Sequence, residues 1–160
     1  MTRIMEFKFD DRLQVLSWVQ TPEELMYWTG RKDFPIETTS IFEEWHSDPE
    51  IRAYILEDKN EKIGYGEIWF DASDNSVELA RLLINPKYRN RGFGHQLVMH
   101  LLNQIDRKSY RSVELRLFPE NIIAKRCYEK SGFIQVSQDI ADEYNRNQPR
   151  NYIWMVHEYH

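Results

Sequence analysis

Six consecutive residues, Arg89-Asn90-Arg91-Gly92-Phe93-Gly94, have the types and the spacing of an anion-binding turn. They follow an apolar run that ends at Ile84 and precede a run with helical periodicity. Glycines let the backbone adopt positive φ and approach a ligand closely. The first N–H groups of a helix are unpaired, and the helix dipole favours an anion beside them. Together with the two arginines, the turn predicts a pyrophosphate site, to which the backbone of His95 can contribute.

Other interpretations of this turn are weaker. Two glycines can simply begin a helix. The dinucleotide-binding pattern Gly-x-Gly-x-x-Gly is incomplete, because Leu97 occupies its third position. An ATP-binding module would carry Gly-x-x-x-x-Gly-Lys-Ser/Thr, which the chain lacks.

A second run offers a proton donor. It reads Asn121-Ile122-Ile123-Ala124-Lys125-Arg126-Cys127-Tyr128-Glu129-Lys130-Ser131-Gly132-Phe133, and its pattern predicts a helix that Gly132 closes. The phenol of Tyr128, with an ordinary pKa of about 10, stays protonated at neutral pH and can protonate a leaving group. The alternative is a half-buried helix aromatic.

Together the two runs resemble the GNAT acetyltransferase superfamily. The first resembles the family's Arg/Gln-x-x-Gly-x-Gly/Ala element, which follows a strand ending in an apolar triplet and often Asn-Pro, here Leu82-Leu83-Ile84-Asn85-Pro86. The second resembles Asn-x-x-Ala-x-x-x-Tyr-x-x-x-Gly-Phe. The resemblance spans about Val77 to Phe133, and the part before Ile51 supports it only by the order of its elements.

The resemblance implies an enzyme that uses acetyl-CoA as co-substrate, without a metal, and that lets an amine attack directly in a ternary complex. The backbone of Leu82, Leu83 and Ile84 would bind the pantetheine arm, and Asn121 would hydrogen-bond the pantetheine or thioester. Tyr128 would point at the thioester sulfur. The pyrophosphate would be wrapped by Arg89, Asn90, Arg91, Gly92, Phe93, Gly94 and His95.

Amide formation also needs a neutral amine. An alkyl amine has a pKa near ~10.4, so only about one molecule in 10³ is neutral at pH 7, and a general base helps. Glu78 is the candidate, because the histone-acetylating branch of the family carries a glutamate at the matching place. One alternative is that an ordered water acts as the base. The other is that Glu78 only forms an ion pair with Arg81 or a nearby lysine.

The acceptor amine is expected between the early helices, the central strands and the last hairpin. Tryptophans and acids together can hold a cation, which predicts a lining of Trp28, Trp69, Asp71 and Tyr144. The alternative is that the tryptophans, including Trp45, are core residues. Cys127 has no visible histidine partner, so a covalent acyl-cysteine mechanism is not expected. The five histidines show no metal-ligand spacing, so no metal is expected.

The elements that must position these residues alternate in type. The predicted fold is α/β (α+β), with a mixed central sheet of about seven strands and about four helices. Helices are expected from Thr21 to Gly30, from Thr39 or Ser40, over 92–107 and over 121–130. Strands are expected at 7–9, 51–56, 62–70, 77–84, 113–117, 133–136 and 152–156, with a polar segment over 139–150. The apolar edge at 152–156 allows pairing with a second chain as a homodimer.

Composition limits the class of protein. A length of 160 residues fits one domain over 1–160, and 41% hydrophobic with 29% charged residues is typical of a globular protein. The net charge of -5 argues against nucleic acid as a partner. No apolar run approaches the ~20 residues that a membrane-spanning helix needs, so we expect no membrane partner. The single cysteine cannot form an internal disulfide and requires no oxidising compartment, so we expect a cytoplasmic location.

The sequence therefore predicts an N-acetyltransferase that acts on a primary amine of a small molecule or of a peptide or protein N-terminus. The alternative is a non-catalytic acyl-CoA-binding sensor of the same fold.

Overall fold

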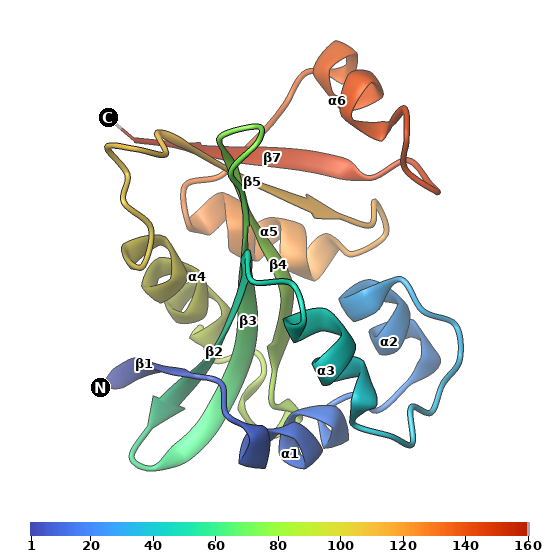
Figure 1. The fold of residues 1–160 in the computed structure, drawn as a ribbon, viewed down its shortest axis with the longest axis vertical. Helices are drawn as coiled ribbons and strands as arrows, with labels where there is room; N and C mark the ends of the chain where they lie inside the picture. The colour runs from blue at the N-terminus through green and yellow to red at the C-terminus, as the bar shows by residue number, and fades with distance from the viewer. Residues whose placement is uncertain (160) are drawn as a thin grey trace.

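The computed structural model describes residues 1–159 and contains a seven-stranded mixed sheet (Figure 1). The strand order is β1-β2-β3-β4-β5-β7-β6, and only β4 and β5 pair in parallel. The predicted fold class is confirmed. The strands are β1 (Thr2–Glu6), β2 (Ile51–Asp58), β3 (Glu61–Asp71), β4 (Ser76–Ile84), β5 (Ser112–Leu117), β6 (Ile134–Gln135) and β7 (Ile153–Glu158).

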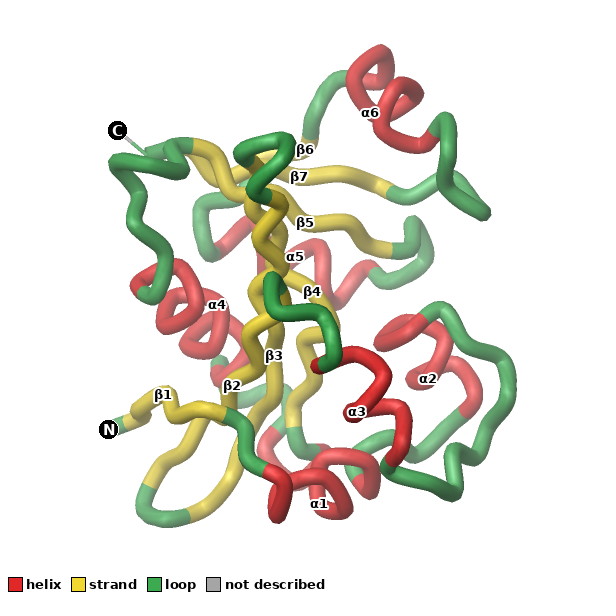
Figure 2. The backbone as a smooth tube through the Cα atoms, viewed as in Figure 1, coloured by secondary structure: helices red, strands yellow, loops and turns green. Residues whose placement is uncertain are grey.

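Six α-helices occur within residues 1–159, two more than the sequence predicts (Figure 2). They are α1 (Arg12–Ser17), α2 (Pro22–Thr29), α3 (Ser40–His46), α4 (Phe93–Asn103), α5 (Ile122–Lys130) and α6 (Gln138–Asn145). No helix in this part of the chain is long and apolar enough to cross a membrane.

Two predicted segments, one near each end of the chain, differ in the structure. The segment over 139–150 was interpreted as a polar connection, but Ser137 caps a helix there by accepting a hydrogen bond from the Ile140 N–H. The first strand is Thr2–Glu6 rather than 7–9, because Phe7 instead packs its ring against Phe42 beneath the early helices.

The sheet separates two apolar cores. On one face α4 packs against the sheet, with Leu97 and Leu101 meeting Val113, Leu115 and Met155. On the other face α1, α2 and α3 cover β2 to β4 around a second core formed by Val15, Leu25, Ile41, Phe42, Ile55 and Tyr65. The sheet therefore presents its central strands to two different helical layers.

A bulge in β4 changes which face its side chains use. The register between β3 and β4 shifts between Tyr65 and Glu67, and Arg81, opposite the shift, has a φ of 51°. Leu79 lies in the α4 core before the bulge, whereas Leu83 lies in the α2–α3 core after it. The bulge thus turns Arg81 and Leu83 toward the early helices.

Strands β4 and β5 pair at one position, Glu78 opposite Glu114, and then diverge (Figure 1). We call the splay between the two strands beyond this pair the slot, meaning the stretch where β4 and β5 are no longer paired. One wall is the bulged end of β4, and the other is β5 with the start of α5.

The last strand is not an edge. β7 lies between β5 and β6, and pairs with both, so the expected free edge at 152–156 is wrong. The sheet ends instead at β1 and at the two-residue β6, a short edge of the kind that resists pairing with another chain.

Candidate active site

The predicted pyrophosphate turn forms an open helix N-terminus. Gly92 precedes α4 with a φ of 83°, and no side chain caps the helix. A Cβ built on Gly92 would have no atom within 4 Å, so the fold leaves the position beside Gly92 uncrowded. Asn90 also has a positive φ, of 60°. This geometry fits an anionic group held by backbone N–H groups.

The two arginines of the turn have different surroundings. Arg89 is directed back into the protein, where its Nε donates to the Ile84 carbonyl at 3.0 Å and its Nη1 pairs with Glu24 at 3.1 Å. Arg91 is exposed and lies against the rings of Tyr88 and Phe93. Arg91 thus supplies positive charge to the open side of the turn, while the side chain of Arg89 holds the turn in place.

The first turn of α4 packs against α5. A Cβ on Gly94 would lie 3.1 Å from Cys127 Sγ, so the glycine permits the close approach of the two helices. The His95 Nδ1 lies 2.9 Å from Ser131 Oγ, at the end of α5. Burial raises the pKa of the Cys127 thiol, which keeps the thiol protonated and unreactive.

Asn121 and Tyr128 belong to the helix that follows β5, with Asn121 at its N-cap and Tyr128 near its end. The Asn121 side chain accepts from the Ala124 N–H and caps α5, which fixes its position beside the end of β5. Tyr128 packs against the α4 core beside Phe133. Desolvation raises the pKa of Tyr128 well above its ordinary value of 10, so the phenol remains a proton donor at neutral pH.

The strand segment Leu82, Leu83 and Ile84 forms the other wall of the slot. It keeps its pairing with β3, where Leu83 lies opposite Tyr65 and Ile84 opposite Gly64. On its other side β5 has diverged, so the register with β5 ends before these residues. Backbone groups on that side have no partner in β5, and of these the Ile84 carbonyl accepts from Arg89 Nε.

Glu78 lies where the slot closes, and it is paired. Both of its carboxylate oxygens accept from Arg116, at 2.8 and 2.9 Å. The expected alternative pairing with Arg81 does not occur. Arg116 also donates to Gln148 at 2.8 Å, and its guanidinium lies 4.7 Å from the ring centroid of Trp154.

A second carboxylate faces Glu78 from β5. Burial raises the pKa of Glu114, and the negative charge of Glu78 raises it further. The Tyr144 hydroxyl donates to Glu114 at 3.3 Å, and the Tyr144 ring lies 5.1 Å from that of Trp154. Tyr144 therefore lies beside the Glu78–Glu114 pair.

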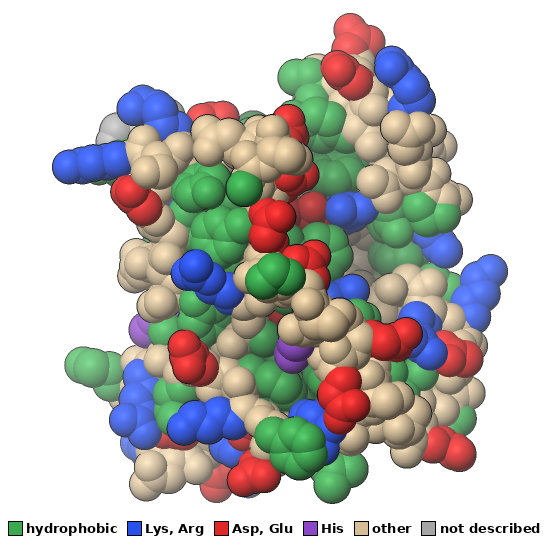
Figure 3. Space-filling model, viewed as in Figure 1, with side chains coloured by type: hydrophobic (Ala, Val, Ile, Leu, Met, Phe, Trp, Pro, Cys, Tyr) green, Lys and Arg blue, Asp and Glu red, His purple; other side chains and the backbone are tan. Residues whose placement is uncertain are grey.

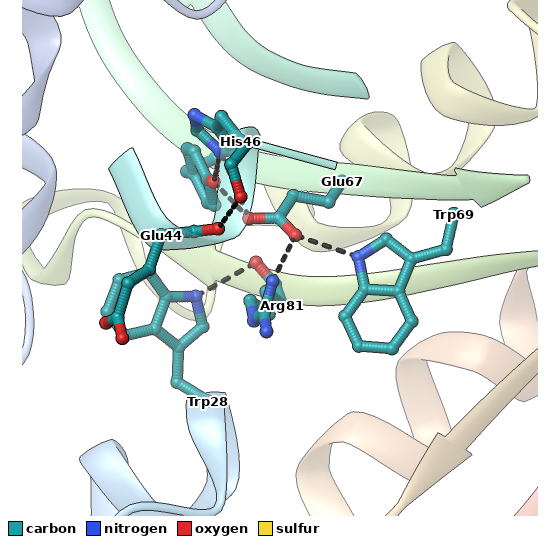
Figure 4. Close-up of polar contacts among 8 residues, drawn as sticks. Trp28, Glu44, His46, Glu67, Trp69 and Arg81 are labelled. Atoms are coloured by element: carbon teal, nitrogen blue, oxygen red, sulfur yellow. Dashed lines mark hydrogen bonds and ion pairs between the residues drawn. The ribbon is translucent and has the colours of Figure 1, made fainter. Parts of the chain in front are cut away.

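The sequence analysis missed a buried polar cluster next to this site, formed by Glu67 and its donors (Figure 4). Glu67 is fully buried and accepts from Trp69 Nε1 at 2.8 Å, from Arg81 Nη1 at 2.7 Å and from the Tyr65 hydroxyl. Burial alone would raise the pKa of Glu67. Its contacts with His46 and Arg81, and the other hydrogen bonds, outweigh burial and leave that pKa below its ordinary value.

This cluster holds the bulge of β4. The Arg81 guanidinium lies 3.9 Å from the ring centroid of Trp45 and 4.8 Å from that of Trp69, and its carbonyl accepts from Trp28 Nε1 at 2.9 Å. Both the side chain and the backbone of the positive-φ residue are therefore fixed. The bulge in turn keeps the slot beside it open.

The predicted acceptor residues fall into two groups. The Trp69 ring centroid lies 5.8 Å from the Arg116 guanidinium and Tyr144 donates to Glu114, so both lie close to the carboxylate pair. Figure 3 shows the surface hollowed between α6 and the early helices. Trp28 is buried and serves the bulge, and Asp71 accepts hydrogen bonds from Ser73 and Asp74 within the β3–β4 turn. The side chains of Trp28 and Asp71 thus make hydrogen bonds within the protein itself.

A sequence signal for Glu67 was present. The run Ile63 to Ile68 is apolar apart from this one acid, and a strand places Tyr65, Glu67 and Trp69 on one face. A lone carboxylate on the buried face of a strand needs partners, and here they come from three separate elements. No metal-binding group of three or more histidine, cysteine or acidic residues is present within residues 1–159.

Comparison with known proteins agrees with this geometry. The family model described as "Acetyltransferase (GNAT) family" matches residues 13–133. A domain from Methanocaldococcus jannaschii is similar, with a TM-score of 0.78, 16% identity and coverage of 99% of this chain and 98% of that one.

Two similar structures contain coenzyme A. The aminoglycoside acetyltransferase AAC(6')-Ib with ribostamycin and coenzyme A has a TM-score of 0.76, 18% identity and coverage of 98% and 93%. The spermidine N-acetyltransferase of Vibrio cholerae with CoA and spermine has a TM-score of 0.75, 19% identity and coverage of 97% and 94%. At these identities the likeness shows the fold, whereas the family model covers most of the sequence: the chain belongs to the GNAT acetyltransferase family.

Proposed function

We propose that the protein transfers an acetyl group from acetyl-CoA to a primary amine by direct attack in a ternary complex. One observation carries the proposal. Strands β4 and β5 separate after the carboxylate pair Glu78 and Glu114, and the unpaired end of β4 leads through the turn to the glycine-led N-terminus of α4. A long thioester substrate fits such a slot with its phosphates at one end and its reactive carbon at the other.

The chain has groups suited to each part of acetyl-CoA. The N–H groups at Gly92 to His95, with the charge of Arg91, would bind the pyrophosphate. The free side of Leu82 to Ile84 would hydrogen-bond the pantetheine arm, and Asn121 lies across the slot from it. Holding both substrates in attack geometry supplies a large part of the rate.

Tyr128 is proposed as the proton donor to the departing thiolate. Its high pKa keeps the proton on the oxygen throughout the neutral range, which is the state that a general acid needs. Cys127 beside it has a raised thiol pKa, so a route through an acyl-cysteine is not favoured.

Glu78 is proposed as the base, acting directly or through a water. Its carboxylate is held in place by two hydrogen bonds from Arg116. Burial and the negative charge of Glu78 raise the pKa of Glu114, so a second carboxylate able to take up a proton lies opposite Glu78. An ordered water between them would pass on the amine proton.

The acceptor is proposed to be a small-molecule amine, because the similar aminoglycoside and spermidine acetyltransferases use such acceptors within the same fold. A peptide N-terminus is the second candidate, since the acceptor side between α2 and α6 is open to the surface (Figure 3). A purely acyl-CoA-binding sensor would not need Tyr128 or the two carboxylates. We also propose a cytoplasmic location.

The test is release of free thiol from acetyl-CoA with a panel of amines. Wild type is expected to release CoA only when an amine is present. The Tyr128→Phe variant should bind acetyl-CoA equally well but turn over about 10² times more slowly, as for loss of a general acid. Amine-independent binding without any thiol release would favour the sensor.

A further inference from the structure

Arg150 is an unusual guanidinium at the acceptor side of the site. It lies in the connection between α6 and β7 and reaches across to α2, where its Nη1 donates to Met26 Sδ at 3.4 Å. Its Nε is buried and has no hydrogen-bond partner within residues 1–159. A buried donor without a partner is costly, so a group that can accept from it gains on binding.

Two other arginines near Arg150 are already paired with carboxylates. Arg81 pairs with Glu67 at 2.7 Å, and Arg116 pairs with Glu78. Arg150 makes no ion pair with a carboxylate anywhere in the described chain, and its guanidinium instead lies 4.9 Å from the ring centroid of Phe118. One positive charge on the acceptor side is therefore left without a counterion.

Ring faces on this side are occupied as well. Trp45 and Trp69 face the guanidinium of Arg81, and Trp154 faces that of Arg116. A cationic acceptor normally relies on free rings and free acids, and here the protein's own guanidiniums hold these rings. An acceptor with a negative group would meet a better partner.

Arg150 is joined to the proposed reaction centre by a continuous aromatic row. The ring of Phe118 lies 5.5 Å from Tyr27 and 5.4 Å from Tyr152, and the Arg116 guanidinium lies 5.6 Å from the Tyr152 ring. Arg150 and the Glu78–Arg116 pair are thus linked through the rings of Phe118 and Tyr152.

We propose that Arg150 binds a carboxylate of the acceptor, so that the acceptor is an amine that also carries a carboxylate, an amino acid rather than a polyamine. This inference rests on the proposed amine transfer. Arginine is suited to the role because its planar fork binds a carboxylate through two hydrogen bonds. The carboxylate of the acceptor would accept hydrogen bonds from Arg150, while the amine of the same molecule would face Glu78.

The test measures binding to the CoA-saturated protein by calorimetry, which needs no turnover. The ligands are β-alanine, γ-aminobutyrate and δ-aminovalerate, each against the alkylamine of the same carbon number. The variant is Arg150→Gln. Arg146→Gln, an exposed position on the same connection, removes the same charge as a control.

Wild type and Arg146→Gln should bind the best amino acid at least about tenfold more tightly than its alkylamine, as for a charged hydrogen bond. Arg150→Gln should lose that preference and keep its affinity for CoA. Equal binding of acid and alkylamine to wild type would overturn the inference. The inference would also be overturned if Arg150→Gln lost affinity for CoA but kept the preference for the amino acid, because the guanidinium would then bind a phosphate of the cofactor.

Thiol release with the same ligands separates this inference from the proposed function. Transfer to alkylamines but not to amino acids would contradict the role of Arg150 and leave amine transfer intact. Tight, Arg150-dependent binding of an amino acid without thiol release would contradict amine transfer and support the anion site.

Discussion

At the scale of single residues, two buried or half-buried glutamates are each paired with an arginine. Glu78 is held by Arg116 where the slot closes, and Glu67 is held by Arg81 beneath the bulge. Both pairs join residues of different strands. Their environments differ, because Glu67 is fully buried while Glu78 remains partly accessible. Glu78 is thus suited to chemistry and Glu67 to holding structure.

We predict that Glu78→Gln lowers the rate about 10²-fold at neutral pH, because the amine proton then has no direct acceptor. The loss should shrink as the pH rises, since more of the amine is already neutral. A pH–rate profile of both proteins measures this. A parallel profile, lowered equally at every pH, would indicate that Glu78 only positions Arg116.

Glu67→Gln should lower the free energy of unfolding by about 3–5 kcal/mol, because it leaves the Arg81 charge without its buried partner. Chemical denaturation at neutral pH measures the change. Glu43→Gln, which removes an exposed partner of Arg12, is the control and should stay close to wild type. A small effect of Glu67→Gln would mean that water replaces the carboxylate.

The same residue predicts a dependence on pH. The pKa of Glu67 is lower in the folded protein than its ordinary value of 4.5. Its stabilising contribution is therefore complete above that ordinary value and is lost as the pH falls through the lowered pKa. Wild type should lose more stability than Glu67→Gln over this acidic range.

At the scale of elements, the packing of α4 on α5 depends on a glycine. Alanine in place of Gly94 would favour the helix by roughly 0.5–1 kcal/mol, but its Cβ would lie 3.1 Å from Cys127 Sγ. We predict that Gly94→Ala gives no gain in stability on its own and a gain in a Cys127→Ala background. A double-mutant cycle in chemical denaturation measures the coupling, and additive effects would contradict the contact.

The sequence predicts the elements that carry strong local signals. Thr21, Pro22 and Gly30 mark the ends of α2 as expected, with the Thr21 side chain accepting from the Glu24 N–H. Helix α6 was missed because its eight residues are mostly polar, with only Ala141 and Asn145 buried. Its position is set instead by the Asn145 side chain, which accepts from Trp154 of β7.

The bulge of β4 is harder to foresee. Nothing in the run Val77 to Ile84 marks Arg81 as a positive-φ residue, since it is not a glycine or an asparagine. Its conformation depends on Glu67, Trp28 and Trp45, which come from other elements. The residue pattern of one strand cannot predict contacts with residues that are distant in the sequence.

At the scale of the whole molecule, the order of strands and helices creates the site. The parallel pair β4–β5 lies in the centre of an otherwise antiparallel sheet, and its divergence connects the two helical layers. The N-terminus of α4 opens on one side, and the arginines and aromatic rings of the acceptor side lie on the other. Family membership and this geometry both indicate acyl transfer, while the acceptor is decided by side chains such as Arg150.

The most direct test of the account is a calorimetric titration of acetyl-CoA into wild type, Gly92→Trp and Gly30→Trp. Both glycines have a positive φ and open space around them, so the two variants share the same backbone strain and differ in location. We predict that wild type and Gly30→Trp bind acetyl-CoA at micromolar concentration and that Gly92→Trp does not. Equal binding by all three proteins, or none by wild type, would contradict the proposal that the turn before α4 holds the pyrophosphate.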